Sequence, residues 1–287
     1  MNISLRLLAL ALFITTTGIA GAAKRTLPCP QCAAWNEPHA PFRLYGNTYY
    51  VGTSGIASIL ITSDEGHVLI DAVLPESVEQ IAANVRTLGF RVEDIKVILN
   101  THAHDDHAGG LARMQKLTGA KVWASPWSAK AFAAGISPDD PQFGVIEPVE
   151  RVANVALLKD GDTVRVGPLA LVAHFTPGHT GGGTSWTWKS CAGKRCLDMV
   201  YADSISAVSG PNFRFTGRTA LLKEFDTSFA TLSSLPCDIL VTPHPEASGL
   251  WERLQKPDGL VDPTACRRYA EGARERLRKR LEDEAAH

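Results

Sequence analysis

One stretch, residues 100–110, constrains the fold of this chain more than any other; it reads NTHAHDDHAGG. Three imidazoles and two carboxylates lie within residues 102–107, a density of ionisable groups that a hydrophobic core does not use. The preceding run 95–99 is short, apolar and rich in β-branched residues, which predicts a buried strand. Leu111, Met114 and Leu117 follow the glycine pair at helical spacing. The motif is therefore predicted to lie on a strand-to-helix loop that holds its side chains in place.

The residue types of this motif indicate a metal site, because imidazole nitrogens and carboxylate oxygens are common zinc ligands. His102 and His104 are two residues apart, so on an extended segment they point the same way. Asp106 and His107 follow where the chain turns into the helix, and a bend there directs them to a second ion. Six residues cannot complete two coordination shells. More ligands must come from elsewhere in the chain.

Two later histidines have the local sequence expected of such ligands. His179 lies between a Pro-Gly pair and three consecutive glycines, and His244 lies between two prolines that restrict its backbone. We expect both to bind metal. His174 falls within a strand pattern and is interpreted as a structural residue. Three other histidines have no such context and are assigned no role: His39, His67 and His287.

The N-terminus has the pattern of a secretory signal peptide over residues 1–22, with one early positive charge, an apolar run and a small-residue end. The apolar run, 7–19, is shorter than the roughly 20 residues of a membrane span. We therefore expect a periplasmic protein, a monomer with no membrane association once the signal is removed. Residues 23–287 contain no repeat or flexible linker and are predicted to form a single domain. The net charge of −1 offers no basic surface for nucleic acid.

Six cysteines in an exported chain favour disulfides over zinc thiolates. Cys191 and Cys196 flank a turn between two strand-like runs, so they are expected to close a hairpin. Cys29 and Cys32 either bridge each other or form a redox-active pair. Cys237 and Cys266 are then left to pair over a longer loop, which would attach the C-terminal helix to the body of the protein.

The remaining pattern alternates strands with helices but includes hairpins, which favours a layered α/β fold with mixed sheets. Asp71 ends one strand and is expected to support the histidine motif, and the Pro-, Asp- and Gly-rich loop 137–148 is long enough to cover a site. An amphipathic helix is expected at the C-terminus. Further strands are expected at 48–51, 57–62, 67–71, 121–124, 161–166, 169–173, 185–188, 199–206 and 238–241, and a helix at 78–88.

In this order, His102-x-His104-x-Asp106-His107, Gly178-His179 and Pro243-His244 make the chain similar to the metallo-β-lactamase superfamily. The segments 176–180, 202–206 and 242–245 most resemble subclass B3. The resemblance implies a four-layer αβ/βα sandwich of two mixed sheets with helices on the outer faces. It also implies two zinc ions per chain. Their ligands would be His102, His104 and His179 for the first ion, and Asp106, His107 and His244 for the second.

The implied activity is hydrolysis of the amide bond of β-lactams (penicillins, cephalosporins and carbapenems), which confers antibiotic resistance. The attacking hydroxide is activated by zinc, so no serine nucleophile is needed, and Asp106 is expected to bind metal and to orient that hydroxide. Ser204 and Ser206 are expected to bind the substrate carboxylate. Gln142 is expected to contact the substrate from the covering loop, and Trp35 to flank the cleft from the N-terminal segment.

Three points stay open at this level. Asp203 either supports the ligands or binds metal itself, as it does in glyoxalase II-like thioesterases of the same superfamily. The chain could accordingly be another hydrolase of the same fold, a lactonase or a thioesterase, although export argues against a cytosolic thioester. A non-catalytic zinc-binding protein is the third alternative; it requires closed metal shells, whereas six ligands over two ions leave positions open.

Overall fold

A computed structural model describes residues 25–286, and the predicted signal peptide lies outside the described residues. Two sheets dominate the structure, as the mixed strand pattern predicted. The first has seven strands in the order β1 to β7, antiparallel from β1 to β4 and parallel from β4 to β7. Its strands are β1 Phe42–Tyr45, β2 Thr48–Tyr50, β3 Ile59–Ile61, β4 His67–Ile70, β5 Ile95–Leu99, β6 Lys121–Ala124 and β7 Ala156–Leu157.

The second sheet has five strands in the order β12-β11-β10-β9-β8, antiparallel except for the parallel pair β11 and β12. The predicted hairpin around Gly167 and Pro168 joins β8 to β9, and the cysteine hairpin joins β10 to β11. The strands are β8 Thr163–Val166, β9 Leu169–Phe175, β10 Thr184–Ala192, β11 Arg195–Tyr201 and β12 Ile239–Val241.

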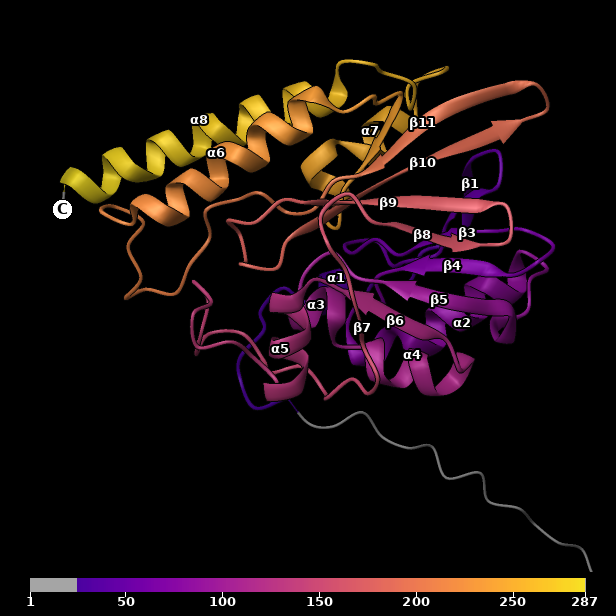
Figure 1. Cartoon of the computed structure of the whole chain (residues 1–287), viewed down its shortest axis with the longest axis horizontal. Coiled ribbons are helices and arrows are strands. Elements are labelled where there is room, and N and C mark those ends of the chain that lie inside the picture. Colours follow the sequence, from indigo (N-terminus) through magenta and orange to yellow (C-terminus); the bar gives the residue numbers. More distant parts are fainter. Residues whose placement is uncertain (1–24, 287) are drawn as a thin grey trace, which may run out of the picture.

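Helices cover the outer face of each sheet, as Figure 1 shows, with α6 and α8 side by side along the second sheet. The α-helices are α1 Cys32–Trp35, α2 Val78–Thr87, α3 Asp105–Ala108, α4 Leu111–Thr118, α5 Pro126–Ala134, α6 Thr219–Ser234, α7 Leu250–Leu254 and α8 Ala265–Ala286. Short 3-10 turns occupy η1 Pro75–Ser77, η2 Val92–Asp94 and η3 Pro245–Ser248. The sequence patterns predict no helix at α1, α5, α6 or α7, and they place the α3 turn in a loop.

Three apolar layers hold this arrangement together, and strand β4 shows why. Val68 and Ile70 point into the layer between the two sheets, whereas Leu69 points into the layer under α2 and α4. A strand buried on both faces is a continuous apolar run in the sequence, and residues 68–70 have this pattern. On the second sheet, Val200 and Leu240 pack against α6 and α8 in the third layer. The fold is thus the four-layer αβ/βα sandwich that the resemblance implied.

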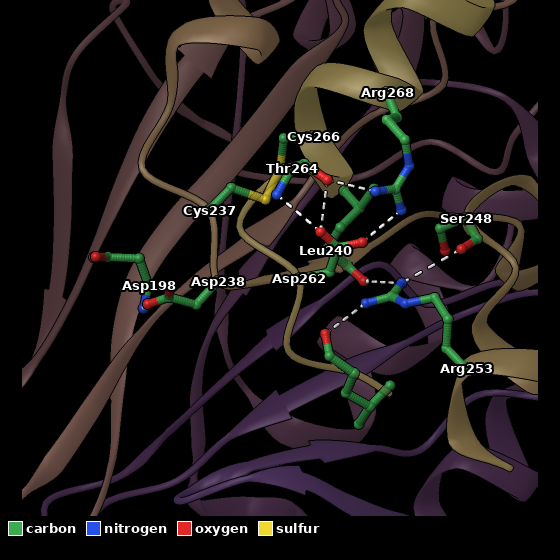
Figure 2. Close-up of a disulfide and its surroundings, with 11 residues drawn as sticks. Asp198, Cys237, Asp238, Leu240, Ser248, Arg253, Asp262, Thr264, Cys266 and Arg268 are labelled. Atoms are coloured by element: carbon green, nitrogen blue, oxygen red, sulfur yellow. Dashed lines mark hydrogen bonds and ion pairs between the residues drawn. A yellow bond between two sulfur atoms is a disulfide. The ribbon is translucent and has the colours of Figure 1, made fainter. Parts of the chain in front are cut away.

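Four of the six cysteines are paired as predicted: Cys191 with Cys196 and Cys237 with Cys266. The open question about Cys29 and Cys32 is resolved, because the structure joins them in a third disulfide. Figure 2 shows the bridge from Cys237, just before β12, to Cys266 in the first turn of α8. Within residues 25–286, none of the helices combines the length and the apolar character that crossing a bilayer requires.

Candidate metal centre

The predicted ligands lie at the ends of strands that share one edge of the sandwich. His102 follows β5, His179 follows β9 and His244 follows β12, while His104 caps the short helix α3 in extended conformation. Asp106 and His107 belong to the α3 turn itself. The turn bends the chain immediately after His104, which directs successive side chains of the motif to two different places.

The first group consists of His102, His104 and His179, all buried. One side-chain nitrogen from each lies within 4.8 Å of the others. The ring centroids are 4.7 Å apart for His102 and His104, 5.0 Å for His102 and His179, and 4.9 Å for His104 and His179. Three imidazoles from two separate chain segments therefore surround one point.

The second group forms around the carboxylate of Asp106. Its Oδ2 atom lies 3.1 Å from Nε2 of His107 and 3.2 Å from Nε2 of His244. The rings of His107 and His244 are 4.8 Å apart. Asp106 and His107 are buried close to His102, so the two groups are adjacent. The structure thus brings the side chains of all six predicted ligands close together, with His102 near both groups.

In each histidine of the first group, the ring nitrogen that points away from the centre of the group has a partner in the protein. Nδ1 of His102 lies 2.7 Å from Oδ1 of Asp203, and Nδ1 of His179 donates to the backbone carbonyl of Ser206 at 2.8 Å. Nε2 of His104 lies 3.0 Å from Asp140. Partners of this kind fix the ring and the tautomer of metal-ligating histidines. Nε2 of His102, facing the centre of the group, is buried without a hydrogen-bond partner, which a zinc ion at that point would satisfy.

The electrostatics also suit a cation. Burial lowers the pKa of His102, His107 and His179, so these imidazoles are neutral and keep a lone pair for a metal. Burial by itself raises the pKa of Asp106, but contacts with His107 and His244 bring it well below its usual value. Three of the five histidines thus offer neutral nitrogens beside one ionised carboxylate, which suits a zinc site. At the other two, contacts with carboxylates outweigh burial: Asp140 raises the pKa of His104, and Asp106 raises the pKa of His244.

Asp71 supports the start of the motif, as expected from its place at the end of β4. Its carboxylate accepts hydrogen bonds from the backbone N–H of Thr101 at 2.8 Å and from the Thr101 hydroxyl at 2.7 Å. Asn100 and Tyr201 donate to the same carboxylate, each at 3.2 Å. Asp71 has a left-handed backbone, with φ of 60°, which is rare for a residue other than glycine and often marks a functional site.

A cleft of about 420 Å³ opens over both groups, and Gln142, Ser204 and Ser206 line it as predicted. Trp35 also lines it, with its ring 5.2 Å from that of His244. The wall further includes Arg25, Pro28, Cys29, Pro30, Gln31, Val145, Ile146 and Val208.

Two features of this site escaped the sequence analysis. Arg25 forms an ion pair of 2.6 Å with Asp105 beside the metal groups, and Asp140 holds His104. Both acidic residues occur next to other acidic residues in segments where solvent exposure is the ordinary expectation, so only the tertiary contacts distinguish them. His174, interpreted as structural, donates to or accepts from the hydroxyl of Thr187 at 2.8 Å and takes no part in the site.

Residues 51–196 match the family model of the metallo-beta-lactamase superfamily, and the chain belongs to that superfamily. Its structure is similar to that of the Rm3 metallo-beta-lactamase, at 53% identity and a TM-score of 0.88, over 90% of this chain and 99% of that one. It is also similar to MEM-A1, a subclass B3 metallo-beta-lactamase from a soil metagenome library, at 46% identity and a TM-score of 0.85, over 88% and 99%.

A shorter sequence match relates the chain to another group of enzymes. A hydroxyacylglutathione hydrolase of Maricaulis maris is 36% identical over 88 residues, which are 31% of this chain and 27% of that enzyme. The fold and site together therefore define a metallohydrolase of the superfamily, and the likeness over nearly the whole described chain is to subclass B3.

Proposed function

We propose that this chain hydrolyses the amide bond of β-lactams with two zinc ions, one in each group of ligands, and thereby confers antibiotic resistance. The observation that carries the proposal is the convergence of both ligand groups in one cleft with Ser204 and Ser206. The likeness to subclass B3 enzymes along the chain supports the same activity. We further propose that residues 23–287 act as a single domain in the periplasm.

Zinc at such a site supplies a water nucleophile that is deprotonated near neutral pH, and it polarises the carbonyl group that it contacts. Side chains of the protein supply the other functions. With zinc bound, the ionised carboxylate of Asp106 would accept the remaining hydrogen of the nucleophile and so orient its attack. Ser204 and Ser206 hydrogen-bond the substrate carboxylate, and Gln142 contacts the substrate from the covering loop. No serine or cysteine acts as a covalent nucleophile.

A thioesterase or lactonase remains the alternative on this scaffold, and the position of Asp203 bears on it. Asp203 lies against Nδ1 of His102, on the side of the ring away from the free Nε2 atom. From there it orients a ligand rather than bridging two ions. Its position favours the β-lactamase assignment over a thioesterase that uses this aspartate as a bridge.

The test is steady-state hydrolysis of a penicillin, a cephalosporin and a carbapenem by the mature chain, beside an acyl-homoserine lactone and a thioester. We expect turnover of β-lactams that chelator abolishes and added zinc restores, with two zinc ions per chain by metal analysis. Chelator-sensitive hydrolysis of only the lactone or only the thioester would transfer the function to that class. A reproducible content of one zinc under zinc-replete conditions would contradict His107 and His244 as ligands.

A further inference from the structure

Asp140 lies in the loop that connects α5 to β7, yet it is only 4% exposed. Both of its carboxylate oxygens are close to Nε2 of His104, at 3.0 Å and 3.2 Å. The same carboxylate accepts the backbone N–H of Gln142 at 2.8 Å. Its own backbone is fixed as well, since its N–H donates to Ser137 and its carbonyl accepts from Phe143. One side chain thus joins a predicted zinc ligand to the wall of the cleft.

We infer that Asp140 is a positioning residue that couples occupancy of the first metal group to the conformation of the covering loop, residues 137–148. The inference rests on the proposed metal site but not on the identity of the substrate.

The geometry at His104 gives the first step. Because Nε2 faces a carboxylate, it carries the proton and donates it to Asp140, which leaves Nδ1 as the unprotonated nitrogen. Nδ1 is therefore the atom available to a cation, and it lies 3.5 Å from Nε2 of Gln142. Loss of the Asp140 carboxylate removes the hydrogen bond that fixes the His104 ring and that favours the tautomer with the proton on Nε2. Such partners commonly contribute 10- to 100-fold to metal affinity.

The anchors of the other two histidines give the second step. His102 is held by Asp203, two residues after the end of β11, and His179 is held by a backbone carbonyl. Within the first group, His104 is the ligand whose anchor belongs to the covering loop. A cation on Nδ1 makes the N–H of the same ring a stronger donor, so it tightens the contact with Asp140. Coupling between two sites is reciprocal, so an ordered loop must in turn favour the bound ion.

The experiment measures zinc affinity by chelator competition and amide hydrogen exchange over residues 137–148, with and without zinc and without substrate. The variants are Asp140→Ala and Asp140→Asn. Asp139→Asn is the matched control, because Asp139 is the exposed neighbour in the same loop. Thermal unfolding in chelator checks that each variant folds.

We expect Asp140→Ala to bind zinc 10- to 100-fold more weakly, and zinc to lose its protective effect on the loop. Asp140→Asn should fall in between, because the amide oxygen still accepts from His104 but carries no charge. Asp139→Asn should match the wild type. If Asp140→Ala should fail to fold, Asp140→Asn carries the test.

The inference would be overturned if both Asp140 variants bound zinc as tightly as Asp139→Asn. It would also be overturned if zinc still protected the loop from exchange in both Asp140 variants. A wild-type chain whose loop exchanges equally fast with and without zinc would contradict it as well. A wild type that shows the coupling but hydrolyses no β-lactam would instead end the proposed function and leave the coupling in place.

Discussion

Nδ1 of His102 lies 2.7 Å from Oδ1 of Asp203, and both side chains are completely buried. The contact uses the ring nitrogen that does not face the other histidines of the first group. Asp203 also accepts, through its backbone carbonyl, a hydrogen bond from Tyr269 of α8 at 3.1 Å. We therefore propose that Asp203, which the sequence left open as a ligand or a support, is a support that is braced from the C-terminal helix.

Asp203→Asn is expected to keep two zinc ions per chain at saturating zinc, while the affinity for zinc falls. The amide still accepts a hydrogen bond from His102, but it lacks the negative charge that increases the ring's basicity, and losses of about 10- to 100-fold are typical for such changes. Metal analysis at saturating zinc and chelator competition separate the two quantities. A drop to one zinc at saturation would identify Asp203 as a ligand.

His179→Ala is expected to weaken the first zinc site and to reduce turnover of every β-lactam. The ring contributes one of three nitrogens to that group, whereas the disulfides and the apolar layers do not depend on its loop. His244→Ala should weaken the second site instead, so the pair distinguishes the two groups. Zinc content and kcat are measured for both variants. Near-wild-type kcat with full zinc occupancy in His179→Ala would contradict the assignment of the first group.

Ser206→Ala is expected to raise KM with little change in kcat, because the hydroxyl is proposed to bind the substrate carboxylate and not the reacting bond. The contact that orients His179 uses the backbone carbonyl of Ser206 at 2.8 Å and survives the substitution, while the hydroxyl lies farther away, at 3.3 Å. Steady-state kinetics at fixed zinc provides the test. An equal fall in kcat and zinc affinity would place the hydroxyl in the metal site.

Removal of the Cys237–Cys266 disulfide by alanine at both positions is expected to destabilise the protein more than removal of Cys191–Cys196. The two bridges close loops with sequence separations of 29 and 5 residues. Loop-closure entropy in the unfolded chain then gives roughly 3–4 kcal/mol for the longer loop and about 2 kcal/mol for the shorter. Urea unfolding of both variants measures the difference, and the reverse order would contradict the entropic explanation.

Glu284 on α8 is expected to stabilise the fold in a pH-dependent way. Burial acts to raise its pKa, but hydrogen bonds from Thr216, Arg280 and Phe215 lower the pKa from 4.5 to about 2. A depressed pKa contributes stability that is fully present above the unfolded value and is lost as the pH falls toward 2. Glu284→Gln should therefore be less stable than wild type at pH 7, with the gap closing between about pH 5 and pH 2.

This comparison is made in chelator for both proteins, so that release of zinc in acid does not contribute. The urea midpoints are measured across the pH range. A gap that stays constant from pH 7 to pH 2 would show that the carboxylate's charge is not the source of the stabilisation.

The sequence by itself indicated the six candidate ligands, because each carries a local signal. The histidine motif is too polar for a core, and His179 and His244 have backbones restricted by glycine or proline. The sequence also indicated most strands, since strands buried on both faces are continuous apolar runs. It indicated the local disulfide between Cys191 and Cys196 as well.

Only the tertiary structure decided the parts of the site that depend on contacts distant in sequence. Asp140 lies 36 residues from His104, and Asp203 lies 101 residues from His102. An acidic residue has the same local appearance whether it is solvated or holds a buried imidazole, so no pattern in the sequence separates the two. The same reason applies to Arg25 and Asp105, 80 residues apart. Local patterns indicate the candidate metal ligands, whereas packing decides which side chains hold those ligands in place.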